Sequence, residues 1–252
     1  MKPNILVLDT ETTSIDTATA GVCQLAALIC EPVGDWDLNI VPLFQTYCKP
    51  SAEMTPEAEK VHGIGPDQYW LMPTDEIAVA VLEFMARQEL GGPEGLVLAG
   101  YNSNGYDLPI ISRLCGGALP GEHKTIDIMW MAMRRDDGKS YKLVDVFEQE
   151  VEDSDFKKTI LTKAHDAMAD CWMTAMCLVQ FCKQMRTNDA NVIADWLARP
   201  MPLHVMPHGK HKGKPFNQVP TSYLTWAAGE WDRMTPDLRC SFEQLGYLKA
   251  GE

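Results

Sequence analysis

Long hydrophobic runs and paired cysteines are both missing from this sequence. No apolar stretch approaches the roughly 18 residues that a membrane-spanning helix requires, and the chain opens on a strand-like run and not on a charged stub followed by a hydrophobic signal segment. None of the eight cysteines forms a C-x-x-C pair. Scattered cysteines of this kind are typical of reduced thiols and not of a disulfide framework. We therefore expect a cytoplasmic protein with no membrane partner.

Positive charge is also scarce. The 252 residues carry 22 Lys and Arg against 35 Asp and Glu, a net charge of −13. Residues 1–200 contribute −14 of this and residues 201–252 contribute +1. Such an acidic chain repels polyanions at long range, which disfavours non-specific binding to nucleic acid. A polyanionic substrate would have to be held locally, by metal ions or by a basic patch.

The order of strand and helix patterns indicates the fold class. Strands come first and are then mixed with helices, which predicts an α/β protein with a central mixed β-sheet flanked by helices. The first three strands read as an antiparallel meander. The expected strands are 5–8, 22–30, 41–48, 95–102 and 124–127, and the expected helices are 56–62, 74–90, 108–115, 128–135, 141–149 and 166–185.

Two carboxylates end the first buried strand. Ile5 to Leu8 are all apolar, and Asp9 and Glu11 follow directly. A carboxylate at the end of a buried strand is costly unless positive charge meets it. Residues two apart in an extended chain share a side, so both could reach one cation. The alternative is an ordinary solvated loop, which is also how we interpret "DWD" at 35–37 and "DSD" at 153–155.

Two further sites carry candidate carboxylates. Asp107 follows the buried run 95–102 and precedes a helix, where it could also be a simple N-cap. Asp170 lies inside the helix 166–185, one position from its apolar stripe of Ala169, Trp172, Met173, Met176 and Val179. Asp166 reads as the N-cap of that helix, and His165 before it could be a polar loop residue. Each site is weak evidence when taken alone.

In combination the three sites resemble a known family. D-x-E at 9–11, N-x-x-x-Y-D at 102–107 and H-D-A-x-x-D at 165–170 resemble the DEDDh, or DnaQ-like, 3′–5′ exonucleases, whose fold is ribonuclease-H-like. "MTPEAEKVHGI" and "KTIDIMWMAMRR" resemble two further segments of that family. The middle motif is one residue longer than in many DEDDh enzymes and is similar to the exonuclease domains of family B DNA polymerases. The resemblance covers roughly residues 1–185.

The resemblance implies a set of roles. Asp9, Glu11, Asp107 and Asp170 would hold two Mg²⁺ ions, for which Mn²⁺ can substitute. Such ions activate water and neutralise charge during phosphodiester hydrolysis, and they would bring positive charge to an acidic protein. His165 would act as general base, since histidine exchanges protons near neutral pH. The family pattern also places substrate-binding residues at Thr10, Thr12 and Asn102.

The C-terminal part differs in composition. We expect an exonuclease domain at 1–185, a connector at 186–200 and a small basic module at 201–252 with a hairpin and a helix. Residues 203–226 resemble the C-terminal module of exodeoxyribonuclease X enzymes, with Gly209, Lys210, Lys212, Gly213, Lys214, Tyr223, Leu224 and Trp226 in matching positions. The three lysines would contact substrate phosphates. Two alternatives stay open, a plain packing module and a zinc site from His204, His208, His211 and Cys240.

The sequence therefore predicts a metal-dependent 3′–5′ exonuclease. Its expected substrate is a DNA 3′ end, preferably single-stranded, and its product is a nucleoside 5′-monophosphate. A 3′–5′ exoribonuclease on the same fold is the nearest alternative, because no identified residue reports on the 2′-hydroxyl. A non-catalytic nucleic-acid-binding module is the more distant one. No segment is identified as a docking site for a protein partner.

Overall fold

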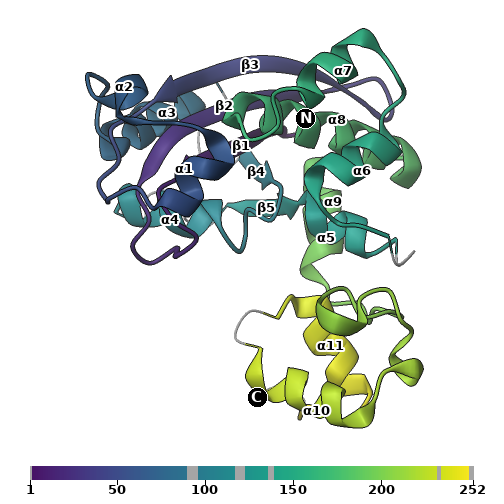
Figure 1. Ribbon diagram of the computed structural model, residues 1–252. Coiled ribbons are helices and arrows are strands. Elements are labelled where there is room, and N and C mark those ends of the chain that lie inside the picture. The colour runs from purple at the N-terminus through teal and green to yellow at the C-terminus, as the bar shows by residue number, and fades with distance from the viewer. Residues whose placement is uncertain (1, 90–95, 117–122, 136–138, 232–233, 250–252) are drawn as a thin grey trace.

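The computed structural model describes residues 2–89, 96–116, 123–135, 139–231 and 234–249. Its centre is a five-stranded mixed sheet with the strand order β3-β2-β1-β4-β5 (Figure 1). β1, β2 and β3 are antiparallel to one another in turn, whereas β4 and β5 run parallel to β1. The strands are β1 Asn4–Thr12, β2 Val22–Val33, β3 Asp37–Tyr47, β4 Leu96–Gly100 and β5 Lys124–Asp127.

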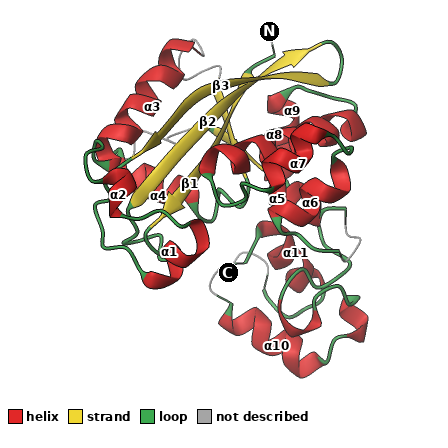
Figure 2. Cartoon of the chain, turned by 45° about the horizontal axis from the view of Figure 1, so that its top comes forward, coloured by secondary structure: helices red, strands yellow, loops and turns green. Residues whose placement is uncertain are grey.

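Helices cover both faces of this sheet and form most of the C-terminal part (Figure 2). In the part of the chain that the structure describes, no helix is long and apolar enough to cross a membrane. The helices are α1 Pro56–His62, α2 Pro66–Tyr69, α3 Asp75–Glu89, α4 Asp107–Leu114, α5 Ile128–Met133, α6 Leu143–Glu150, α7 Asp155–Leu161, α8 Ala167–Met185, α9 Ala190–Ala198, α10 Thr221–Glu230 and α11 Pro236–Gln244.

β1 is buried on both faces, which explains its continuous apolar run. Ile5 and Val7 belong to a hydrophobic cluster formed with α8, while Leu6 and Leu8 belong to a second cluster with α3 and α4. Side chains alternate along a strand, so odd-numbered residues of β1 face α8. Asp9 and Glu11 continue the odd-numbered set. The hydrophobic pattern of β1 thus decides which face of the sheet receives the two carboxylates.

Most of the expected elements are present, with small shifts at their ends. The meander of the first three strands is confirmed. Thr55 caps α1 by accepting from the Ala58 N–H, and Gly63 ends that helix in the left-handed conformation at φ 69°. Asp166 caps α8 by accepting from the Ala169 N–H at 3.2 Å. In each case a short polar side chain satisfies a backbone N–H that has no partner within the helix.

Three helices were not expected from the sequence. The first is α2, a single turn at Pro66–Tyr69 that begins with a proline. The "DSD" segment is not a plain loop, because Ser154 caps α7 and accepts from the Lys157 N–H at 3.0 Å. α11 begins at Pro236 after the N-cap Thr235. α7 and α11 are short, and their capping signals are also those of ordinary turns. α9 falls in the stretch expected as a connector, and its buried residues join the hydrophobic cluster of α8.

The C-terminal residues have a hydrophobic cluster of their own. It includes Met206, Leu224 and Phe242, contributed by the basic loop region, α10 and α11. Short 3-10 turns at Gly209–His211 and Phe216–Gln218 shape the chain between them. We use the name C-terminal module for residues 201–249. Figure 1 shows it as a separate lobe below the sheet, joined to the rest through α9. The domain boundary near residue 200 stays a prediction.

One buried ion pair attaches this module to the core. The Arg134 guanidinium, at the end of α5, donates to both carboxylate oxygens of Asp237 at 2.6 and 2.8 Å. Both side chains are 3% exposed. Arg134 also donates to the carbonyls of Trp196, Leu197 and Arg199 at 2.7 to 2.9 Å. One planar cation therefore holds α5, the end of α9 and the start of α11 together.

Candidate active site

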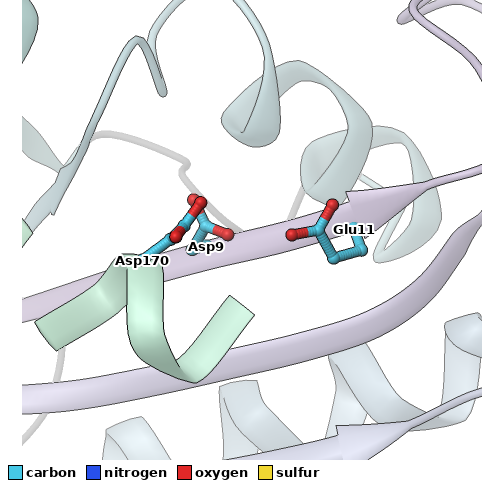
Figure 3. Close-up of side chains that lie close together, drawn as sticks. All are labelled: Asp9, Glu11 and Asp170. Atoms are coloured by element: carbon cyan, nitrogen blue, oxygen red, sulfur yellow. The ribbon is translucent and has the colours of Figure 1, made fainter. Parts of the chain in front are cut away.

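Three carboxylates meet on the α8 face of the sheet. β1 supplies Asp9 and Glu11, and α8 supplies Asp170 (Figure 3). Ligand-capable oxygen atoms of all three lie within 4.8 Å of one another. Among the residues that the structure describes, this is the sole group of three or more that could share a metal ion. We call Asp9, Glu11 and Asp170 the carboxylate cluster.

The start of α8 fixes the position of Asp170. The Asp166 carboxylate caps the helix and also accepts from Gln24 Nε2 of β2 at 2.8 Å, which ties the helix start to the sheet. The backbone N–H of His165 donates to Asp170 Oδ1 at 3.3 Å. His165 has a φ of 68°, in the left-handed region that few residues other than glycine adopt. This turn aims the carboxylate of Asp170 at β1.

Asp107 approaches β1 from the other side. Pairing of β1 with β4 ends at Val7 and Ala99, so the next part of β1 has no strand beside it there. Asp107 fills that place: its Oδ1 accepts from the Thr10 N–H at 3.1 Å and from Thr10 Oγ1 at 2.5 Å. Asp107 is therefore neither a loop residue nor an N-cap, because Tyr106 occupies the cap position. It lies beside the cluster but outside the group of three.

The four carboxylates are mutually repulsive in a buried setting. Burial, and then the charges of Asp107 and Asp170, raise the pKa of Asp9 well above its usual range. Burial followed by the charge of Asp170 raises the pKa of Glu11 to about 8. Burial likewise raises the pKa of Asp170 to about 7 and that of Asp107 to about 6, although hydrogen bonds from Thr10 lower the latter. The site accumulates more negative charge than its protein surroundings neutralise.

The donor set fits a hard divalent cation. All candidate ligands are carboxylate oxygens, which Mg²⁺ and Mn²⁺ prefer, and sulfur and imidazole are not among them. A bound cation would also relieve the repulsion that raises these four pKa values. The zinc alternative has no such support, since His204, His208, His211 and Cys240 form no metal-binding group in the described residues.

His165 lies in the turn directly before α8. The residue is exposed and lines a surface pocket of about 480 Å³ together with Gln45, His62 and Asp166. Its backbone N–H donates to Asp170, so the turn that carries His165 also positions a member of the carboxylate cluster. His165 itself is not a member of that cluster.

The predicted substrate residues on β1 have internal partners. Thr10 Oγ1 binds Asp107, and the Thr12 hydroxyl bonds to the Tyr106 hydroxyl and to the Ser14 carbonyl. These hydroxyls therefore position the start of α4, where Asp107 lies. A substrate-binding role for Thr10 and Thr12 stays a prediction.

Asp127 is a positioning residue that the sequence interpretation missed. It ends β5 and is fully buried. Its two oxygens accept from the backbone N–H groups of Asn102 at 3.0 Å and Asn104 at 3.2 Å. Asn102, predicted to bind substrate, is exposed and has a φ of 58°. Asp127 therefore stabilises a left-handed turn that lies shortly before Asp107 in the chain. The signal was available, because in "KTID" a carboxylate follows a strand pattern just as in "LVLD", although β1 continues past Asp9 to Thr12.

His62 is a second positioning residue, from the "VHGI" segment. Its Nδ1 accepts from the Ile64 N–H at 3.0 Å. The proton of the neutral ring is therefore on Nε2, which lies 3.2 Å from the Thr12 carbonyl and donates to it. Burial lowers the pKa of His62, in keeping with this neutral form. α1 is thus fastened to the end of β1, next to Glu11.

The three predicted lysines lie in the C-terminal module, apart from the carboxylates. Lys210, Lys212 and Lys214 are all exposed. The Lys210 backbone N–H donates to the Tyr223 hydroxyl at 3.2 Å, which fixes the basic loop on α10. Lys212 Nζ lies 5.0 Å from the centre of the Tyr141 ring in the core. Lys212 therefore contributes to the contact between module and core, and Lys210 and Lys214 are the better placed of the three for phosphates.

Comparison with solved structures gives the same fold. An E. coli exonuclease I–ssDNA complex in a zinc-bound form aligns with a TM-score of 0.55 and 21% identity over 79% of this chain and 43% of that chain. E. coli exonuclease I with a dT13 oligonucleotide aligns with a TM-score of 0.57 and 19% identity over 78% and 44%. Exonuclease X with 5′ overhanging duplex DNA aligns with a TM-score of 0.53 and 19% identity over 76% and 98%.

The chain thus spans less than half the length of the exonuclease I chains, but nearly all of the exonuclease X chain. No curated protein matches the sequence significantly. The profile of the RNase_T exonuclease family, in contrast, matches residues 6–178, which include β1, α4 and the first part of α8 with all four carboxylates. The chain therefore belongs to the RNase_T, DnaQ-like family of exonucleases.

Proposed function

We propose that the protein is a divalent-metal-dependent 3′–5′ exonuclease that removes nucleoside 5′-monophosphates from DNA ends, single strands most readily. The observation that carries this proposal is the convergence of Asp9, Glu11 and Asp170 within 4.8 Å, in a chain of an exonuclease family. The similar exonuclease I and exonuclease X structures are complexes with DNA, which supports DNA over RNA as the substrate.

The chain's own residues divide the work. Asp9, Glu11 and Asp170, with Asp107 beside them, would hold two Mg²⁺ ions, which when bound supply an activated water and stabilise the leaving oxygen. A ring nitrogen of His165 takes the proton of the attacking water. Asp127, Thr10 and Thr12 hold the segment from Asn102 to Asp107 in place. Crowded carboxylates with raised pKa values repel substrate phosphate unless cations neutralise them, so binding and hydrolysis both depend on the metal.

The state of the cysteine thiols bears on the cellular location of the protein. All eight cysteines are free in the structure, and none is paired in a disulfide. Six of them are buried, where burial raises their pKa values and keeps them unreactive. This usage supports a cytoplasmic location, which stays a prediction.

A labelled-oligonucleotide time course tests the proposed function. Single-stranded DNA and RNA of one sequence, labelled at the 5′ end, would be incubated with Mg²⁺, with Mn²⁺ and with EDTA. Stepwise shortening of the DNA ladder only with metal, lost in Asp9→Asn, is the expected result. Faster shortening of the RNA would contradict the DNA assignment. Intact oligonucleotides under every condition would refute the enzymatic proposal itself.

A further inference from the structure

A cleft separates the core from the C-terminal module and opens beside the carboxylates. Its volume is about 660 Å³, within the range of about 300–1,000 Å³ typical of ligand sites. The core wall includes Asn104, Tyr106 and Trp130, and the module wall includes His208, Met234 and Pro236. Tyr106 directly precedes Asp107, whose carboxylate reaches β1 through Thr10. The Tyr106 hydroxyl also bonds to the Thr12 hydroxyl on β1, next to Glu11. This wall of the cleft therefore reaches the end of β1 that carries the carboxylates.

The chemistry of the two walls differs from that of the rest of the core. No Asp or Glu is among the described residues that line the cleft, although the chain carries 35 of them. The lining combines flat or apolar groups, such as Trp130 and Met234, with polar side chains such as Asn104 and His208. Aromatic and apolar surfaces stack bases, and an acid-free wall does not repel phosphate. Lys210, two residues after His208 in the sequence, is exposed.

The cleft is a stable feature because both walls are fastened. Asp127 holds the Asn102–Asn104 turn of the core wall through two backbone hydrogen bonds. On the module wall, Pro236 directly precedes Asp237, whose buried ion pair with Arg134 fixes the start of α11. The space between core and module is thus preformed, and a bound strand need not order it.

We propose that this cleft holds the single strand of nucleic acid immediately upstream of the bond that is cut. The inference rests on the proposed exonuclease function and extends it. Only the terminal nucleotide leaves at each step, whereas the remaining polymer needs a continuous path from the carboxylates to solvent. The cleft supplies that path, from Tyr106 past Trp130 to His208. The occupant is one or two nucleotides, held by stacking and by hydrogen bonds to amide and imidazole side chains.

Two substrates of different length separate the cleft from the chemistry. The p-nitrophenyl ester of thymidine 5′-monophosphate has a scissile bond but no upstream strand, whereas dT12 has both. Asn104→Asp and His208→Glu place negative charge on opposite walls, the first with no change in size. Asn217→Asp is the matched control, since Asn217 is exposed on another surface of the module. The quantity to measure is kcat/KM for dT12 divided by kcat/KM for the ester.

The ratio cancels any effect on catalysis that both substrates share, including that of a new charge near Asp107. We expect the ratio to fall about tenfold in Asn104→Asp and in His208→Glu and to stay at the wild-type value in Asn217→Asp. A wild-type ratio retained in both cleft variants would overturn the assignment. So would a fall of the same size in Asn217→Asp. If the wild type hydrolyses neither substrate with Mg²⁺, the proposed function itself is refuted, which is a distinct outcome.

Discussion

Glu11→Gln should stabilise the protein when metal is absent, against the usual effect of changing a buried residue. Glu11 is 8% exposed, and burial with the charge of Asp170 raises its pKa from 4.5 to about 8. This difference in the pKa of Glu11, at about 1.36 kcal/mol for each pH unit, corresponds to about 5 kcal/mol. This is the order of the penalty for ionising Glu11 in the folded, metal-free protein.

The sign of the pH dependence follows from the raised pKa. Below pH 4.5 the carboxyl is protonated in both folded and unfolded chains, so Glu11 has no net effect. As the pH rises towards 8 the unfolded chain releases its proton and is stabilised, whereas the folded chain retains the proton. The metal-free wild type therefore loses stability relative to Glu11→Gln between about pH 4.5 and 8, and the full difference is present above pH 8.

Thermal unfolding in EDTA, followed by circular dichroism from pH 4 to 9, measures this difference. At pH 9 the melting temperature of Glu11→Gln should exceed that of the wild type by about 10 °C, and the two should coincide at pH 4. Glu148→Gln makes the same change on the exposed surface of α6 and should have no effect. Addition of Mg²⁺ should raise the melting temperature of the wild type more than that of Glu11→Gln. A Glu11→Gln protein less stable than wild type at pH 9 would refute this reasoning.

Other substitutions test the remaining parts of the molecule. His165→Ala should lower kcat by about 10²–10⁴-fold yet keep the Mg²⁺-induced stabilisation, since its ring is not in the carboxylate cluster; loss of that stabilisation would make it a ligand. Arg134→Met leaves Asp237 as an unpaired buried carboxylate and should reduce the free energy of unfolding, measured in urea, by about 3–5 kcal/mol. The same result is not expected for Arg134→Met combined with Asp237→Leu, which removes both charges. The double substitution Lys210→Ala with Lys214→Ala should raise KM. It should also make KM less sensitive to salt, by the amount expected for the loss of up to two phosphate contacts. An unchanged salt dependence would show that the basic loop does not anchor substrate.

The central sheet and three of the four carboxylates could be predicted because their signals are local. An unbroken apolar run identified β1 as a buried strand, and the two-residue period placed Asp9 and Glu11 on one face. The helical stripe of α8 placed Asp170 at the edge of the core. These inferences need only the geometry of one strand or one helix. The pattern could not say which face of the sheet α8 would cover.

The rest of the site depends on contacts between distant segments. The bond between Asp107 and Thr10 joins positions 97 residues apart and exists because β4 ends before β1 does. Asp107 was grouped with the other three carboxylates by the family resemblance alone, and the structure places it beside them. Asp127 and Arg134 were missed for a similar reason. Their partners at Asn102 and Asp237 are fixed by how strands and module dock, which no local period encodes.

The hydrogen bonds of the Arg134 guanidinium have a consequence for protein engineering. The guanidinium donates to five oxygen atoms: two belong to Asp237 of α11, and three are the backbone carbonyls of Trp196 and Leu197 in α9 and of Arg199 directly after it. The orientation of the C-terminal module therefore depends on residues of the exonuclease core. A chimera that transplants residues 201–252 alone onto another exonuclease would carry Asp237 without its counterpart. The C-terminal module would keep its own hydrophobic cluster, but its orientation relative to the new core would not be fixed. A working transplant must bring the end of α5 and all of α9 as part of the graft.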